Sequence, residues 1–171
     1  MLETGLTYPV PILSLRGDGH ALTISVVGYQ YPDEAYFPDS EWLTIEVSGE
    51  YAGQTWTRRD PAIIAADLNY LAQWFKALHT DIPLETNLMG FWEQSLYFHH
   101  LGTTPDGVYK MEIWLDFEFK PPGFQASPGA QQECVLSFEL SREQIFAIAQ
   151  AAERGVKLFP SRRKWDHSRR M

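Results

Sequence analysis

The chain has 171 residues, 44% of them hydrophobic and 14% aromatic, which fits one folded domain and excludes both a disordered chain and two ordinary domains. Its net charge is −8, and residues 1–160 alone carry −12, because residues 161–171 hold five of the 14 Lys and Arg residues and only one acid. Such an acidic body repels phosphate backbones, so we expect no nucleic-acid partner. With a single cysteine, no signal peptide and no apolar run of roughly 20 residues, we expect a cytoplasmic protein without a membrane partner.

The first part of the chain predicts strands joined by turns. Residues 21–31 are rich in β-branched and aromatic side chains, which is typical of a strand, and a polar, proline-bounded loop follows over residues 32–41. The next run alternates in the manner of a strand, with apolar positions Leu43, Ile45 and Val47. Gly49 and Gly53 bracket an expected hairpin turn.

Residues 60–79 give the clearest helical pattern. Asp60 is a good N-cap, and Pro61 fits the first helical position, where its missing N–H costs nothing. Apolar residues then recur at spacings of four and three, which makes one helical stripe of Ile64, Leu68, Leu71, Phe75 and Leu78. We therefore expect a helix that begins after Asp60 and buries one face.

The second half of the chain predicts more strands. Residues 81–102 fit two short strands separated by a polar bend, and residues 107–119 fit one long alternating strand. Residues 120–130 form a loop, because their prolines remove the donors that a sheet needs. Residues 131–140 predict a further strand that includes Cys134, which we interpret as a core side chain rather than a nucleophile.

The last predicted element is a second helix. Ser141 and Gln144 have the spacing of a capping box, and Gly155 fits the position just after the helix end. Because strands arrive in runs rather than in alternation with helices, we expect an α+β fold with a largely antiparallel, multi-stranded sheet and both helices packed on one face. Residues 1–160 form this single domain, and residues 161–171 form a basic, flexible tail.

The long strand carries acids and a tryptophan on the face that the helices are expected to leave open. These residues are Glu112, Trp114, Asp116 and Glu118. Carboxylates two positions apart on a strand are separated by roughly 6.5–7 Å, which would suit a two-carboxylate glycosidase. Catalysis also needs a cleft that moves the two pKa values apart, and the sequence indicates none. We therefore favour a solvated face or a face that docks a partner.

The sequence carries none of the common motifs for catalysis, metal binding or nucleotide binding. HExxH, HxH and CxxC spacings are absent, and the adjacent His99 and His100 point to opposite faces of a strand, so they cannot chelate one metal together. GxSxG, GxGxxG and P-loop runs are also absent. We expect no catalytic residues, no metal and no cofactor.

The loop of residues 31–42 is the strongest candidate for a protein-binding surface. It interleaves acids with aromatic residues and contains no base. Aromatic anchors supply contact energy, and the acids steer a cationic partner toward the surface. The predicted partner-binding residues of this loop are Asp33, Glu34, Tyr36, Asp39, Glu41 and Trp42. The alternative is a polar loop whose aromatic side chains fold back on the sheet.

Three segments in order carry a family resemblance: "GYQYPDEAYFPDSEWLTIEV", "DPAIIAADLNYLAQWF", and a late strand that runs into "FELSREQ" and a helix. With them the chain resembles the WapI-like immunity proteins of bacterial polymorphic toxin systems. The resemblance implies a cytoplasmic, non-enzymatic protein that binds and neutralises a cognate toxin's basic C-terminal domain, often a nuclease. A nuclease needs a cationic cleft for phosphates, and an acidic inhibitor matches that charge.

Two other functions stay open at this stage. A small hydrolase could use carboxylates such as Glu112 and Asp116, and it would need a deep pocket in which they converge. A structural subunit could instead use the same acidic face to form a homo-oligomer. The partner-binding residues predicted on the long strand are Glu112, Trp114, Asp116 and Glu118.

Overall fold

The computed structural model describes residues 8–164, which form two four-stranded antiparallel sheets and two helices. The strands of the first sheet are, in order, β1 (Val10–Arg16), β2 (His20–Tyr29), β3 (Trp42–Tyr51) and β4 (Gln54–Ile64). Those of the second sheet are β5 (Leu88–Met89), β6 (Leu96–Thr103), β7 (Tyr109–Leu115) and β8 (Cys134–Leu140). The helices are α1 (Ala65–His79) and α2 (Arg142–Leu158), and two 3-10 turns are η1 (Asp39–Glu41) and η2 (Phe117–Phe119).

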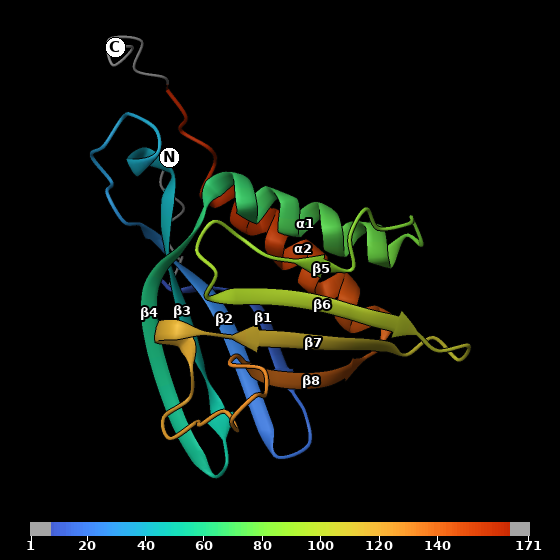
Figure 1. Cartoon of the computed structure of the whole chain (residues 1–171). Coiled ribbons are helices and arrows are strands. Elements are labelled where there is room, and N and C mark those ends of the chain that lie inside the picture. Colours follow the sequence, from blue (N-terminus) through green and yellow to red (C-terminus); the bar gives the residue numbers. More distant parts are fainter. Residues whose placement is uncertain (1–7, 165–171) are drawn as a thin grey trace.

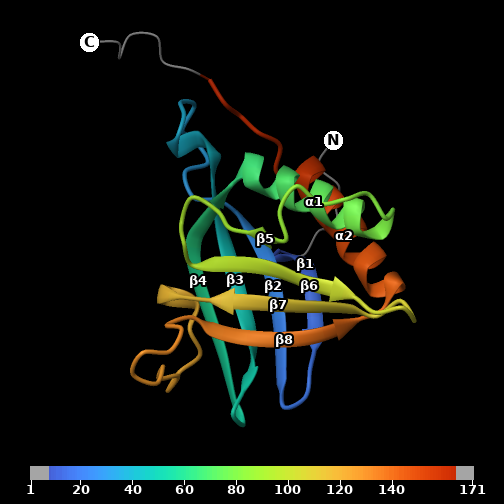
Figure 2. The same ribbon diagram turned by 45° about the vertical axis from the view of Figure 1, so that its right-hand side comes forward.

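The two sheets face each other, with the strands of one crossing those of the other (Figures 1 and 2). Apolar side chains from both inner faces form one buried cluster, which includes Ile24 and Ile45 from the first sheet and Phe98 and Ile113 from the second. His20 joins the sheets directly, because one ring nitrogen lies 2.8 Å from the carbonyl oxygen of Ser137 on β8. The α+β class and the antiparallel pairing are confirmed, and the strands divide between two sheets, β1–β4 before α1 and β5–β8 after it.

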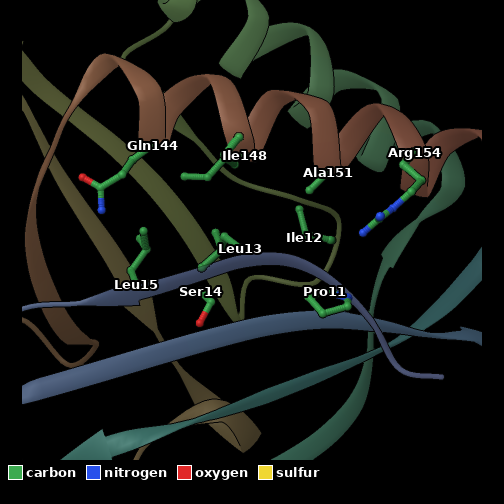
Figure 3. Close-up of a pocket in the computed structure, with 10 residues that line it drawn as sticks. Pro11, Ile12, Leu13, Ser14, Leu15, Gln144, Ile148, Ala151 and Arg154 are labelled. Carbon is green, nitrogen blue, oxygen red and sulfur yellow. The ribbon is translucent and has the colours of Figure 1, made fainter. Parts of the chain in front are cut away.

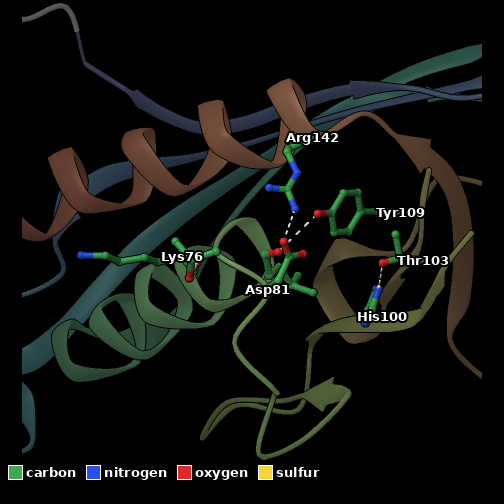
Figure 4. A network of polar contacts seen from close by, with 8 residues as sticks. Lys76, Asp81, His100, Thr103, Tyr109 and Arg142 are labelled. Atoms are coloured by element: carbon green, nitrogen blue, oxygen red, sulfur yellow. Dashed lines mark hydrogen bonds and ion pairs between the residues drawn. The ribbon is translucent and has the colours of Figure 1, made fainter. Parts of the chain in front are cut away.

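The helices lie side by side on one side of the sheets, and α2 also packs along the edge strand β1 (Figures 1 and 2). Two polar contacts tie the helices together near the C-terminal end of α1. Arg142, at the start of α2, pairs with Asp81 just after α1 (Figure 4), and Lys76 lies 3.5 Å from Glu153. Beside the first pair, the Tyr109 hydroxyl donates a hydrogen bond to the last turn of α1. No helix among residues 8–164 has the length and apolar character needed to span a membrane.

Helix α1 begins later than the sequence predicts. Asp60 and Pro61 belong to β4, where a proline is tolerated because β4 is the edge strand of its sheet. The helix is instead capped from inside its first turn, because the buried Asp67 carboxylate accepts a hydrogen bond from the backbone N–H of Ile64 at 3.0 Å. The prediction of Asp60 as N-cap was therefore wrong. All five side chains of the predicted apolar stripe are buried, but only four of them lie in the helix, because Ile64 is the last residue of β4.

Two glycines also serve other roles than the sequence predicts. Gly49 lies within β3, and the tight turn that follows is made by Ala52 and Gly53, both with positive φ. Gly155 lies inside α2, which continues to Leu158, so it is not a residue beyond the helix end. A methyl group at Gly155 would lie 3.4 Å from a methyl carbon of Leu68, so this glycine marks the close approach of the two helices.

The start of α2 agrees with its prediction. The Ser141 hydroxyl accepts a hydrogen bond from the Gln144 N–H at 3.2 Å, and the Gln144 side chain accepts one from the Ser141 N–H at 2.9 Å. The capping box is therefore confirmed. Cys134 is buried at the start of β8, where burial raises the pKa of its thiol to about 11. This environment suits a core side chain and keeps the thiol protonated at neutral pH.

Candidate functional site

The loop between β2 and β3 projects beyond the sheets, and the chain that follows α2 runs up to it (Figures 1 and 2). The base of the loop is closed by a hydrogen bond of 2.8 Å from the Gln30 N–H to the Trp42 carbonyl oxygen. The Phe37 N–H, near the middle of the loop, donates to the Lys164 carbonyl oxygen at 3.1 Å. The predicted binding loop and the first part of the basic tail are therefore in contact.

Glu41 lies at the centre of that contact and is 0% exposed. Its carboxylate accepts hydrogen bonds from the Ser161 hydroxyl, at 2.9 Å, and from the backbone N–H of Arg162. The surface role predicted for Glu41 is therefore wrong in this structure. The sequence places Glu41 in an acidic loop, but its hydrogen-bond donors lie about 120 residues further along the chain.

The Arg162 side chain fastens the two ends of the loop to each other. Its guanidinium group donates hydrogen bonds to the carbonyl oxygens of Ser40 (2.7 and 3.1 Å), Pro32 (2.7 Å) and Tyr31 (3.1 Å). The same group lies over the Tyr29 ring, 3.6 Å from its centroid. Burial raises the pKa of the Tyr29 hydroxyl, and the positive charge of Arg162 opposes this shift. Residues 161–164 thus bind the loop and are not a free tail, and residues 165–171 lie outside the described residues.

Most of the other predicted loop residues remain on the outside. Tyr36 is 47% exposed, and an open hollow of about 580 Å³ is lined in part by Asp33, Glu34 and Asp39. Glu34 is half-buried, and its carboxylate accepts hydrogen bonds of 2.8 and 2.9 Å from the next two backbone N–H groups. Trp42 is half-buried beneath the loop. The loop therefore presents acids and an aromatic side chain to solvent.

Trp92 extends this surface, and the sequence analysis did not single it out. It is 56% exposed, and its ring packs edge-on against Phe37, at 5.5 Å between centroids, and against Trp42, at 6.1 Å. It comes from the β5–β6 connection, so about 50 residues separate it from the loop in sequence. We call Asp33, Glu34, Tyr36, Asp39 and Trp92 the loop surface. The only hint in the sequence is the pair of aromatic residues in an otherwise polar bend.

Three acids from different elements, one of them the residue that follows Trp92, lie close enough for their charges to interact. They are Asp60 on β4, Glu93 in the β5–β6 connection and Glu118 in η2. The pKa of Asp60 is raised above its usual value, first by burial and then by the negative charges of Glu118 and Glu93. Burial is therefore the main cause of this raised pKa, and the two neighbouring negative charges add to it. The sequence predicts Asp60 to be a helix cap, so the grouping of these three acids can be recognised only in the folded protein.

The outer face of the second sheet carries a separate aromatic cluster around Glu112. One carboxylate oxygen of Glu112 accepts a hydrogen bond from the Trp114 indole at 2.9 Å and lies 3.3 Å from the His99 ring nitrogen Nδ1. The Trp114 ring also packs against His99 and Tyr97, with centroid distances of 5.4 and 5.8 Å. All four side chains are half-buried, and we call them the outer-face cluster.

Asp116 and Glu118 do not continue that face, because β7 ends at Leu115. Asp116 caps η2 by accepting a hydrogen bond from the Phe117 N–H at 2.8 Å, and it forms an ion pair with Lys120 at 2.7 Å. Glu118 is exposed within η2. The prediction of a strand reaching residue 119 was wrong, because a turn with a positive φ at Phe117 breaks the alternation.

The loop surface and the outer-face cluster are neighbours through the β5–β6 connection. Gly90, at one end of this connection, lies so close to Tyr97 that a Cβ there would be 2.8 Å from the ring. Trp92 then packs on the loop. Aromatic and acidic side chains therefore continue from the loop onto the second sheet.

This geometry can be set beside known protein families. The model of the immunity protein WapI-like family matches residues 12–160 of the chain. The chain belongs to this family. The search of curated proteins returns no match.

In this WapI-like protein the matched residues include both sheets, both helices and the loop surface. The match ends at residue 160, directly before Ser161 and Arg162, which hold the loop. Ser161 and Arg162 therefore lie outside the residues that the family model matches, whereas the loop that they contact lies inside them.

A groove between β1 and α2 of this WapI-like protein differs in character from the loop surface. It has a volume of about 300 Å³ and is lined mainly by apolar side chains (Figure 3). Its ten lining residues include no carboxylate. Glu112 and Asp116, the acids of the hydrolase alternative, are each engaged by different neighbours and do not converge. The described residues also form no group of three or more side chains suited to bind a metal.

Proposed function

We propose that this protein neutralises a cognate toxin by binding its basic toxin domain through the loop surface, without catalysing a reaction. Membership of the WapI-like immunity family carries the proposal, because it assigns the chain an immunity role and hence a toxin partner. The cytoplasm, where the toxin would otherwise act on its producer, is the proposed place of action.

The composition of the surface supports a cationic partner. The loop surface combines the exposed rings of Tyr36 and Trp92 with acids, and aromatic side chains are enriched among residues that dominate binding energy. Glu93 follows Trp92 in the chain, and the negative charges of Glu93 and Glu118 both act on Asp60. A cation placed near them would gain attraction and offset part of this effect.

The outer-face cluster is the proposed second part of the interface. We keep as partner-binding residues Glu112, Trp114, Asp116 and Glu118. We no longer include Glu41, because it is buried. We add Tyr97 and His99 to the proposed partner-binding residues, since they pack on Trp114. A nuclease is the toxin type that best fits an acidic inhibitor, because a nuclease active site must be cationic to hold phosphates.

The test uses the purified toxin domain encoded beside this gene. The wild-type protein should form a complex at micromolar concentration or below and should protect cells that express the toxin. Tyr36→Ala and Trp92→Ala should each weaken binding at least about tenfold, because each truncates an exposed aromatic anchor. Tyr70→Ala is the matched control, since Tyr70 is 62% exposed on α1 and should leave the affinity unchanged.

Two results would count against the proposal in different ways. Failure of the wild-type protein to bind or protect would contradict toxin neutralisation itself. Binding that is lost with Tyr70→Ala, but not with Tyr36→Ala or Trp92→Ala, would keep the immunity role and reject the loop surface as its site.

A further inference from the structure

The acidic loop is held in shape by a residue that lies after the last helix. Arg162 donates to the carbonyl oxygens of Tyr31 and Pro32 at the start of the loop and of Ser40 at its end. A planar guanidinium group suits this task, because its donors point in fixed directions and can reach several acceptors at once. One side chain therefore fixes the distance between the two ends of the loop.

The same segment also supplies hydrogen bonds to a buried carboxylate. The Glu41 carboxylate has no solvent exposure, and it accepts hydrogen bonds from the Ser161 hydroxyl and the Arg162 N–H. A buried carboxylate that loses its donors is strongly destabilised, so the loop cannot keep this conformation if the segment leaves. The loop and residues 161–162 thus form one structural unit.

Arg162 itself is poorly placed to contact a partner. All three guanidinium nitrogens donate to carbonyl oxygens of the loop, and one face of the group is covered by the Tyr29 ring. Its positive charge would also repel a basic partner. Any effect of Arg162 on binding should therefore be transmitted through the loop.

We propose that Arg162 is a positioning residue, which holds the loop in the conformation that presents Tyr36 and Asp39 to a cationic partner. The binding part of this inference rests on the proposed function, whereas the ordering of the loop does not. A loop that is ordered before binding loses less conformational entropy on association, so partner affinity should depend on a side chain that the partner does not touch.

The first experiment needs no partner. Amide hydrogen exchange is measured for residues 31–41 in the wild-type protein, in Arg162→Ala and in Arg154→Ala, whose side chain is exposed on α2. Exchange at Ser40 and Glu41, whose N–H groups donate within the loop, should be at least about tenfold faster in Arg162→Ala and unchanged in Arg154→Ala. Unchanged exchange in Arg162→Ala would overturn the inference.

Arg162→Lys keeps the positive charge but not the forked geometry. We expect it to fold even if the alanine variant does not, and to show intermediate exchange. Wild-type exchange rates in Arg162→Lys would mean that charge alone holds the loop, which contradicts the proposed geometric role.

The second experiment measures binding to the toxin domain encoded beside the gene. Arg162→Ala should weaken binding about tenfold, and most of that loss should disappear when Tyr36→Ala is already present, because both changes remove the same presented contact. In a Glu112→Gln background the loss should persist in full. A purely structural effect would instead give the same loss in both backgrounds and would overturn the positioning role.

The two experiments separate this inference from the proposed function. If the wild-type protein does not bind the toxin, the proposed function and the binding role of Arg162 both fail, and the exchange data still decide whether Arg162 orders the loop. If exchange becomes faster but the affinity does not change, the toxin-binding function stands and the positioning role is rejected.

Discussion

Individual carboxylates in this protein have different roles that follow from their surroundings. Glu41 is buried and accepts hydrogen bonds from the chain end, and Asp67 is buried and caps α1. Asp116 forms an ion pair with Lys120, whereas Asp60 lies near two other acids. The formal charge of each is the same, so its neighbours decide whether it stabilises the fold, caps a helix or contributes to a negative surface.

Asp60→Asn should stabilise the folded protein at neutral pH. The folded-state pKa of Asp60 is raised by burial and then by Glu118 and Glu93, so its ionised form is disfavoured in the folded state. A carboxyl with a raised pKa costs stability as the pH rises through the interval between its unfolded and folded pKa values, and it costs none below both. We expect a Tm increase of about 1–3 °C at pH 7 that vanishes near pH 3.5.

Thermal unfolding followed by circular dichroism at the two pH values measures this effect. Asp106→Asn is the control, because a hydrogen bond with Thr104 lowers the pKa of Asp106 and removing that carboxylate should give no increase in Tm. An Asp60→Asn variant with an unchanged or lower Tm at pH 7 would contradict the view that burial and neighbouring acids disfavour the ionised form of Asp60 in the folded protein.

At the scale of elements, short sequence signals compete with the packing of whole strands and helices. Asp60 and Pro61 form a good helix start in isolation, yet β4 runs through them because pairing with β3 continues up to Ile64. Gly155 likewise looks like a helix end, yet α2 continues for three more residues and packs its Gly155 backbone close to α1. Tertiary packing overrides the local signal in both cases.

The glycine within α2 gives a prediction at this scale. Gly155→Ala should raise the free energy of unfolding by up to about 1 kcal/mol, because alanine has the higher helix propensity and its methyl group would make ordinary contact, at 3.4 Å, with Leu68. Gly155→Val should lower it, since its larger side chain would force α1 and α2 apart. Urea unfolding of both variants measures the difference, and destabilisation by Gly155→Ala would mean that the helices cannot accommodate even one methyl group.

At the scale of the whole molecule, net charge bears on the proposed interaction. The chain carries a net charge of −8, which would attract a basic partner such as the proposed toxin domain over a long range. This attraction would act mainly on the rate of encounter, whereas the proposed contacts of Trp92 would act mainly on the rate of dissociation.

The rate constant for association with the toxin domain should therefore fall about tenfold or more between roughly 20 and 500 mM salt, with a smaller change in the dissociation rate constant. Stopped-flow measurements over this range test the expectation. The combined variant Asp33→Asn and Asp39→Asn should show a weaker salt dependence, and Trp92→Ala should keep the wild-type dependence. An association rate that does not respond to salt would argue against a cationic partner.

The sequence by itself determined the family, the α+β class, the antiparallel pairing and much of the core, although it did not predict β1 and its buried side chains. These follow from patterns within a few residues: the alternation around Ile45 and Leu136, the helical stripe through Leu68, and the capping box at Ser141. Such patterns act locally, so they can be recognised without knowing what lies opposite them.

Only the tertiary structure decided how the strands divide between two sheets and which acids reach the surface. The burial of Glu41 by Ser161, the packing of Trp92 on Phe37 and the approach of Glu93 to Asp60 all join residues that lie far apart in sequence. No periodic pattern in the sequence predicts these contacts, because they depend on the path that the chain takes after a helix or a long loop. The sequence therefore pointed to the loop and to Glu112 and Trp114 on β7, whereas the contribution of Trp92 and the grouping of Asp60 with Glu93 and Glu118 appear only on folding.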